Sequence, residues 1–206
     1  MPTMPMFPLG TVLVPHQLLP LQVFEPRYHA LVADCLSADR RFGVVLIERG
    51  SEVGGADTRF AVGTVARIVE TADLPGGRTG LAAVGEARLH VNRWLPDDPY
   101  PLAEVEVLAE GPVSDAARAL RVKLAAAFAR VVELARALGA AVPDAGLPLA
   151  ADPRRATWEA AAMAPIGPLD ALAVLGEDDL ERRMEKLTAA IDAAAELLEL
   201  RWRPNA

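Results

Sequence analysis

Four side chains capable of acid–base or ionic chemistry lie within five consecutive positions, those of Glu25, Arg27, Tyr28 and His29. A carboxylate, a guanidinium, a phenol and an imidazole form an active site only when they converge on one point. Pro26 suits the first turn of a helix, where its missing N–H has no intrahelical partner. At about 100° per residue, such a helix turns Tyr28 toward its apolar face and Arg27 toward solvent or a neighbouring acid. We therefore predict a structural cluster with no catalytic residue.

The remaining nucleophiles have no visible activator. Cys35 falls on the same apolar helix face as Tyr28, where a thiol is more often an inert apolar group than a reactive one. None of the serines lies in a G-x-S-x-G context, and the glycine-rich stretches "GSEVGGADTRFAVG" and "PGGRTG" match neither phosphate-binding glycine motif. We therefore expect a chain that is not an enzyme and that uses no cofactor.

Composition and charge argue against several kinds of partner. One cysteine and three histidines are too few for a dense cluster of nitrogen and sulfur ligands, so no metal site is expected. The formal net charge of −7 repels phosphate backbones and argues against nucleic acid. No stretch reaches the roughly 18 consecutive apolar residues of a membrane helix, and the start "MPTMPMFPLG" lacks the basic residues of a signal peptide. We expect a cytoplasmic protein without a membrane partner.

A proline-rich apolar stretch near the N-terminus is the candidate binding site. It reads "FPLGTVLVPHQLLPLQVFEP", and its prolines remove backbone donors, which confines these runs to sheet edges or strand ends. Some apolar side chains should then lie near the surface, where an edge or groove can accept a peptide. The candidate peptide-binding residues are Leu13, Pro15, Pro20, Phe24, Glu25 and Arg27. The alternative, that the whole stretch is core, remains open.

The first half of the chain has the pattern of a small β-barrel. Short apolar runs such as "FGVVLIERG", "RFAVGTVARIVE" and "PLAEVEVL" are typical of strands. The turn "PGGR" joins "IVETADL" to "TGLAAVGEARLHVNRW" and predicts one long hairpin. Gly63 and Gly85 interrupt its two arms, and isolated strand glycines mark bulges or bends, as in a sheet that curls toward closure. We predict a β-rich domain over residues 1–110.

The second half has the pattern of helices. After Gly111 and Pro112 the composition shifts to Ala, Leu, Glu and Arg, which predicts a helical domain over residues 113–206. Ser114 can cap a first helix, and Gly139 can end it. The apolar stripe expected for that helix is Ala117, Leu120, Leu124, Phe128, Val131 and Leu138.

Two further helices are expected. Asp152 and Pro153 can start one, because proline suits the first helical position. From Glu177 the apolar spacing is heptad-like, with Leu180, Met184, Leu187, Ile191, Ala194 and Leu198 in one stripe. That stripe must pack either within the chain or against a second copy, and we expect a monomer or a weak dimer.

The order of these pieces resembles a known family. The segments "FPLGTVLVPHQLLPLQVFEPRYHALVADCL", "FGVVLIERG", "VGTVARIVETADLPGGRTGLAAVGEARLHV" and "YPLAEVEVL" resemble the N-terminal, substrate-binding domain of Lon proteases, and "LGEDDLERRMEKL" resembles its helical end. The match is strongest to small, stand-alone bacterial proteins made of this domain. It implies an α+β fold, with a PUA-like β-barrel followed by a helical bundle. It also implies a chain without the family's ATPase and protease modules.

The resemblance implies a function in protein binding. In Lon proteases this domain helps to recruit unfolded or tagged substrates, and no catalytic role is attached to the motif that matches residues 24–28. The leading hypothesis is a non-enzymatic module that binds polypeptide or unfolded segments, as an adaptor or a holder. The alternative is RNA binding, because PUA-like barrels can bind RNA, but that reading rests on the fold alone.

Overall fold

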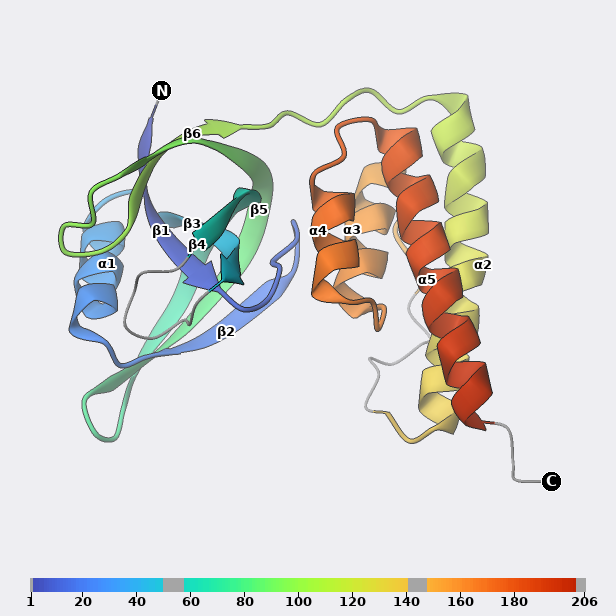
Figure 1. The fold of residues 1–206 in the computed structure, drawn as a ribbon, viewed down its shortest axis with the longest axis horizontal. Coiled ribbons are helices and arrows are strands. Elements are labelled where there is room, and N and C mark those ends of the chain that lie inside the picture. The colour runs from blue at the N-terminus through green and yellow to red at the C-terminus, as the bar shows by residue number, and fades with distance from the viewer. Residues whose placement is uncertain (1, 50–57, 141–147, 203–206) are drawn as a thin grey trace. The chain divides into compact units, whose positions relative to one another are not determined.

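The computed structural model describes residues 2–49, 58–140 and 148–202. Within these residues the chain forms six strands and five helices. One helix lies between the second and third strands, and the other four follow the last strand. The structure divides into two compact units, Met1–Ala109 and Glu110–Ala206 (Figure 1). All six strands and helix α1 (Pro26–Ser37) belong to the first unit, and the remaining helices belong to the second. The α+β fold predicted from the sequence is confirmed. The last residue of "FGVVLIERG" and the first part of "GSEVGGADTRFAVG" lie outside the described residues.

The six strands of the first unit close into a barrel. They are β1 (Thr3–Leu9), β2 (Leu18–Val23), β3 (Arg41–Arg49), β4 (Thr58–Leu74), β5 (Arg78–Leu95) and β6 (Leu102–Val107). The sheet order is β2-β5-β4-β3-β1-β6, and β6 pairs with β5 as well, which closes the ring. Among the strand pairs that the structure describes, only β1 with β3 is parallel. One side of β5 is shared, because β2 pairs with residues 79–84 and β6 with residues 89–95.

The predicted hairpin is formed by β4 and β5, and its glycines serve the purposes expected of them. Gly76 and Gly77 make the turn with φ values of 79° and 70°, which favour glycine. Val65 pairs with Ala87 and Ala66 pairs with Gly85, so the residue between them, Glu86, has no opposite partner and forms a bulge. The bulge that the sequence predicts near Gly85 is therefore confirmed.

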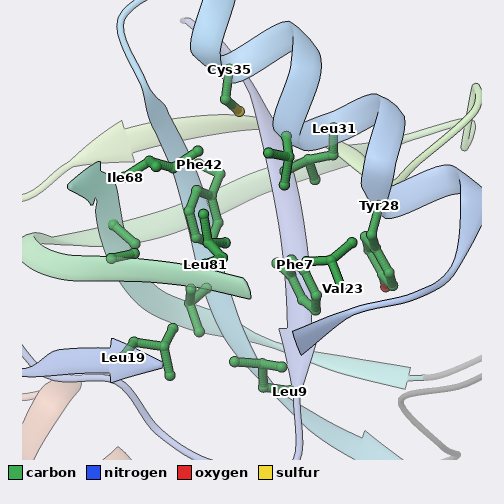
Figure 2. Close-up of a cluster of buried hydrophobic side chains, with 14 of the residues drawn as sticks. Phe7, Leu9, Leu19, Val23, Tyr28, Leu31, Cys35, Phe42, Ile68 and Leu81 are labelled. Atoms are coloured by element: carbon green, nitrogen blue, oxygen red, sulfur yellow. The ribbon is translucent and has the colours of Figure 1, made fainter. Parts of the chain in front are cut away.

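Helix α1 packs an apolar face against the core of the barrel. Tyr28, Leu31, Val32 and Cys35 are buried, as the helical spacing predicts. The Tyr28 ring stacks on Phe7 of β1, with ring centroids 4.0 Å apart and an angle of 10° between the rings. Figure 2 shows Tyr28 pointing from α1 into the cluster beside Phe7 and Val23.

The second unit is a group of four helices, α2 (Asp115–Ala137), α3 (Pro153–Met163), α4 (Pro168–Leu175) and α5 (Leu180–Trp202). Helices α2 and α5 pack side by side and run in the same direction (Figure 1). Ser114 contacts Glu181 near the start of both helices, and Arg130 contacts Glu199 near the end of both. Ser114 caps α2 by accepting a hydrogen bond from the Ala117 N–H at 2.9 Å. The sequence did not predict α4.

The predicted apolar stripes match the buried residues in the first turns of the helices and depart from them in the last turns. In α2 the residues Ala117, Leu124, Phe128 and Val131 are buried, but Leu138 is 40% exposed, and Val132 and Ala135 are buried near it. In α5 Ala195 is buried where Ala194 was expected. The physical reason is that a straight helix repeats every 3.6 residues, so a stripe drawn with a shorter repeat leaves the buried face after a few turns.

Candidate polypeptide-binding site

Strand β2 presents alternate side chains to the surface. Leu19 and Val23 are buried in the main core, and Leu21 packs against it. Because successive strand residues point to opposite faces, Leu18, Pro20 and Gln22 share the outer face. Leu18 is 59% exposed, and Phe24, just after the strand, is 56% exposed. A short segment therefore carries two large exposed apolar side chains.

The outer face of β2 continues across β5 and β4 as a groove of about 370 Å³. The strand register places two rows of residues across it, Pro20–Ala82–Glu70 and Gln22–Gly80–Ala72. Gly80, Ala82 and Ala72 thus contribute small side chains, while Glu70 and Leu74 of β4 also line the groove. Small side chains let a bound backbone approach the sheet closely. We call this feature, with its neighbours Leu18 and Phe24, the β2 groove.

A second, smaller hollow adjoins the β2 groove. It has a volume of about 70 Å³, shares Leu21 and Gln22 with the groove, and is bordered by Phe24 and Glu25. Its other lining residues, Phe7, Leu9, Val23 and Tyr28, belong to the main core. Phe24 therefore lies where the groove meets a recess that reaches the core.

Proline limits how a peptide could bind to β2. Among the described strands, β2 pairs only with β5, so no described strand pairs with its other edge. The Gly85 N–H donates to the Gln17 carbonyl, and by alternation the polar backbone groups of Leu18, Pro20 and Gln22 face away from β5. Pro20 has no N–H, so the row of donors on this edge is interrupted. Contact through side chains in the groove is therefore favoured over addition of a strand.

The four polar residues at the start of α1 point in different directions. Arg27 Nε donates to Glu25 Oε2 at 3.0 Å, and the Arg27 guanidinium lies 4.5 Å from the centre of the Tyr28 ring. His29 Nδ1 lies 3.3 Å from Thr79 Oγ1 on β5. Tyr28 enters the core. Of the four, Tyr28 and His29 tie α1 to the barrel.

Two of the sequence candidates are not presented to a partner in this structure. Leu13 is 2% exposed, and its carbonyl accepts a hydrogen bond from Thr64 Oγ1 at 2.6 Å. Pro15 is buried as well. Pro20 and Phe24 are exposed, and Glu25 and Arg27 are partly covered. Leu18 and the small residues of β4 and β5 were not among the candidates predicted from the sequence, although the alternation in "LLPLQV" indicates that Leu18 faces outward.

The thiol of Cys35 in the first unit is buried. Burial, with smaller contributions from Asp39 and Asp34, raises the pKa of Cys35 to about 12. Its Sγ donates to the Arg41 carbonyl at 3.2 Å. Within the described residues, no group of three or more His, Cys, Asp or Glu side chains could hold a metal ion. No helix in that same part of the chain is long and apolar enough to cross a bilayer.

Comparison with known proteins assigns the family. Residues 3–193 match the family described as the ATP-dependent protease La (LON) substrate-binding domain. The chain belongs to this Lon domain family. Lon protease 2 of Herpetosiphon aurantiacus is 29% identical over 96% of the chain, and Lon protease of Anaeromyxobacter dehalogenans is 32% identical over 68% of it. The chain spans 24% and 17% of the lengths of these two relatives.

Solved structures of Lon domains share the fold. A Lon N-terminal domain protein from Xanthomonas campestris is 28% identical, with a TM-score of 0.64 over 92% of this chain and 98% of that one. The N-terminal domain of a Mycobacterium avium complex Lon protease has a TM-score of 0.69 with the same coverage, at 16% identity. The Lon-type fold inferred from the sequence is therefore confirmed.

Proposed function

We propose that this Lon-type domain binds exposed apolar segments of unfolded polypeptides through the β2 groove, without cleaving them. The observation that carries the proposal is the groove itself, with its floor of Gly80, Ala82 and Ala72 and the exposed side chains of Leu18 and Phe24 beside it. The membership in a family of substrate-binding domains supports the same class of ligand.

The groove suits a ligand of varied sequence. Its flanks are mostly apolar, and Glu70 is the only ionisable residue among the described residues that line it. Apolar burial is non-directional, so a surface of this kind accepts many apolar side chains and selects weakly among them. Burial of one large apolar side chain contributes about 1.5–3 kcal/mol, so two or three such contacts give weak, reversible binding after the entropic costs of association.

A role as an adaptor or a holder of unfolded chains follows from such binding, and we propose that it operates in the cytosol. We propose no catalytic step, since the polar residues at the start of α1 pair with one another or with the barrel and the one thiol remains protonated. Purified protein should therefore neither bind ATP nor degrade casein. Proteolysis that co-purifies with the chain and is lost on substitution of one of its serines would contradict this part of the proposal.

The binding test uses a permanently unfolded ligand. Reduced, carboxymethylated lactalbumin carrying a fluorescent label would be titrated with the protein, and native lactalbumin would serve as the folded comparison. Leu18→Ser and Phe24→Ser should each weaken binding by roughly fivefold to tenfold, because each removes part of one apolar contact. Native lactalbumin should bind at least tenfold more weakly than the unfolded form.

Leu169→Ser is the matched control. Leu169 is 66% exposed in α4 of the second unit, so the substitution removes a side chain of the same type and similar exposure from a place outside the groove. Its affinity should stay within about twofold of the unchanged protein. Equal loss in Leu18→Ser and Leu169→Ser, with circular dichroism showing both folded, would overturn the assignment of the groove.

A further inference from the structure

Glu70 and Arg78 lie on the same face of the β4–β5 hairpin as the β2 groove. The strand register pairs Leu74 of β4 with Arg78 of β5, and Ala72 with Gly80. Because side chains alternate between the two faces of a strand, Glu70 shares a face with Ala72 and Leu74, and Arg78 shares that face with Gly80. Ala72, Leu74 and Gly80 all line the groove. One acid and one base therefore accompany its apolar residues.

The carboxylate of Glu70 is not neutralised by a neighbouring cation. Glu70 is exposed and lines the groove. Within the described parts of the chain, its side chain has no ion pair and no hydrogen bond. Arg67, earlier on the same strand, is bound to Glu86, with 2.5 Å between Arg67 Nε and Glu86 Oε1. The negative charge of Glu70 is thus available to a ligand in the groove.

The guanidinium group of Arg78 is held beside the groove by neutral acceptors. Its Nε donates to the Pro75 carbonyl at 3.1 Å, and its Nη1 donates to Gln22 Oε1 at 3.2 Å. Gln22 lines the groove, so this second contact places the guanidinium group at the border of the groove. Among the described residues, no carboxylate pairs with Arg78. A fixed cation with unused donors therefore lies at this border.

The acids closest to Arg78 in the strand register and along β2 do not neutralise it. Asp73 is opposite Thr79, one position from the pair that contains Arg78, so by alternation Asp73 and Arg78 point to opposite faces of the hairpin. Glu25, just beyond β2, accepts a hydrogen bond from Arg27 Nε at 3.0 Å. The groove therefore has a free acid and a free base on one face.

The two charged residues lie at different positions along the groove. Glu70 precedes Leu74, the partner of Arg78, by four residues on β4. At about 3.3 Å per strand residue, the Cα atoms of Glu70 and Arg78 are about 13 Å apart along the strand direction. In an extended polypeptide the same spacing separates residues i and i+4, which point to one face together with residue i+2. A bound segment can thus bring one side chain to each charge and an apolar side chain to the small residues Gly80 and Ala82.

We propose that the β2 groove selects polypeptide segments in which an apolar residue lies between one basic and one acidic side chain, the basic one at Glu70 and the acidic one at Arg78. This inference rests on the function proposed above and adds the charge pattern of the ligand. A segment with two like charges brings one of them against a like charge of the groove. Both groove charges are exposed, so each contact changes the affinity by a few fold and acts mainly on specificity.

The test uses four peptides that differ only at two positions. The mixed peptide is Leu-Ser-Lys-Ser-Leu-Ser-Asp-Ser-Leu, with an amidated C-terminus and a dye of zero net charge at the N-terminus. The other three carry Lys, Asp or Gln at both of the charged positions. In titrations followed by fluorescence anisotropy, the mixed peptide should bind about fivefold more tightly than the Lys–Lys and Asp–Asp peptides. This preference should shrink as salt is raised.

The Lys–Lys peptide provides the stricter comparison. The net charge of −7 attracts this peptide at long range and repels the Asp–Asp peptide. Tighter binding of the mixed peptide than of the Lys–Lys peptide must therefore come from a local cation at the groove. Equal or tighter binding of the Lys–Lys peptide would contradict the assignment of Arg78.

Charge reversal at each end identifies the residues responsible. Arg78→Glu should make the Lys–Lys peptide the tightest ligand, and Glu70→Lys should make the Asp–Asp peptide the tightest. Arg118→Glu and Glu133→Lys in α2 are matched controls, because they change the net charge by the same amounts at exposed positions of the second unit. Both controls should retain the preference for the mixed peptide. An unchanged ranking in Arg78→Glu or in Glu70→Lys would overturn the proposal.

The uncharged Gln–Gln peptide separates this inference from the function on which it rests. Its affinity should stay within about twofold in Arg78→Glu and Glu70→Lys, because the apolar contacts of the groove remain. Equal affinity of the unchanged protein for all four peptides would overturn the charge pattern and leave the apolar groove in place. Absence of peptide binding while unfolded lactalbumin still binds would overturn it as well. If neither lactalbumin nor any peptide binds, the function proposed above fails together with this inference.

Discussion

The ring of Tyr28 lies flat against the ring of Phe7, with centroids 4.0 Å apart, and joins the first turn of α1 to the barrel strand β1. Tyr28 is 4% exposed and belongs to the main core. Helix α1 has no side-chain cap at its start, so it depends on this packing more than on local hydrogen bonds. The contact explains why an aromatic residue follows Pro26 so closely.

Tyr28→Ala should therefore destabilise the barrel unit strongly. Replacing a buried aromatic ring by alanine typically costs about 3–5 kcal/mol, because it removes apolar burial and leaves a cavity. Urea unfolding followed by circular dichroism measures the change. Tyr28→Phe is the control, since it keeps the stacked ring and should cost much less. An unchanged free energy of unfolding in Tyr28→Ala would show that α1 is held by something else.

Arg27→Ala should cost about 1–2 kcal/mol, which is more than an exposed ion pair contributes. The side chains of Arg27 and Glu25 are only 19% and 18% exposed, and the guanidinium also lies over Tyr28. The same unfolding measurement tests this value. Arg93→Ala provides a comparison, because Arg93 is 66% exposed in its pair with Glu104 and should cost less. If both variants lose the same free energy of unfolding, the partial burial of Arg27 adds no stability.

Gly85→Ala should destabilise the barrel near the bulge. A Cβ atom at this position would lie 2.3 Å from the Val14 carbonyl oxygen, a backbone atom that cannot move away alone. Overpacking of this kind costs about 1–3 kcal/mol. Gly80→Ala on the same strand is the control, because its Cβ would meet the nearest atoms at 3.5 Å, an ordinary contact. Similar melting temperatures for the two variants would contradict this account.

The helix starts and the β-bulge could be predicted from the sequence, because each is specified by a few neighbouring residues. Pro26 and Ser114 mark helix starts, and the glycine of "VGEA" marks the bulge, because each acts on the backbone beside it. The closure of the barrel was predicted only in outline. The parallel pairing of β1 with β3 and the double pairing of β6 depend on residues far apart in the chain, and no local pattern specifies them.

The same distinction applies to the candidate sites. The sequence singled out Phe24 and Pro20 because proline and exposed apolar residues occur together there, but the β2 groove also needs Ala72 and Gly80, which look unremarkable in sequence. Arg183 is a similar case in the second unit. It is fully buried, with its guanidinium 4.6 Å from the Trp158 ring centre and 2.7 Å from Glu110, and nothing in the helical pattern separates it from an exposed arginine.

Glu177 should make the helical unit sensitive to acid. Hydrogen bonds from Lys186, from the Asp179 N–H and from Arg182 lower its pKa to about 2 from an ordinary value of 4.5. Because the folded pKa is depressed, the stabilisation is fully present above about pH 4.5 and is lost as the pH falls toward 2. Glu177→Gln should thus lower the free energy of unfolding at pH 7 and have little effect near pH 2. A difference that does not change with pH would exclude this linkage.

RNA should bind weakly to this chain, although PUA-like barrels can bind RNA. Tight binding to phosphate backbones requires several cations that release counterions together, and its affinity falls steeply with salt. The chain has a net charge of −7, and many of its arginines are already paired with acids, as in Arg93–Glu104, Arg130–Glu199 and Arg155–Glu159. A labelled single-stranded RNA and an RNA hairpin, each titrated at 50 and 200 mM salt beside an established RNA-binding protein, would measure this. We expect dissociation constants no tighter than about 100 μM, the weak end of non-specific binding. Tight association that weakens sharply between the two salt concentrations would favour RNA over polypeptide as the ligand of this barrel.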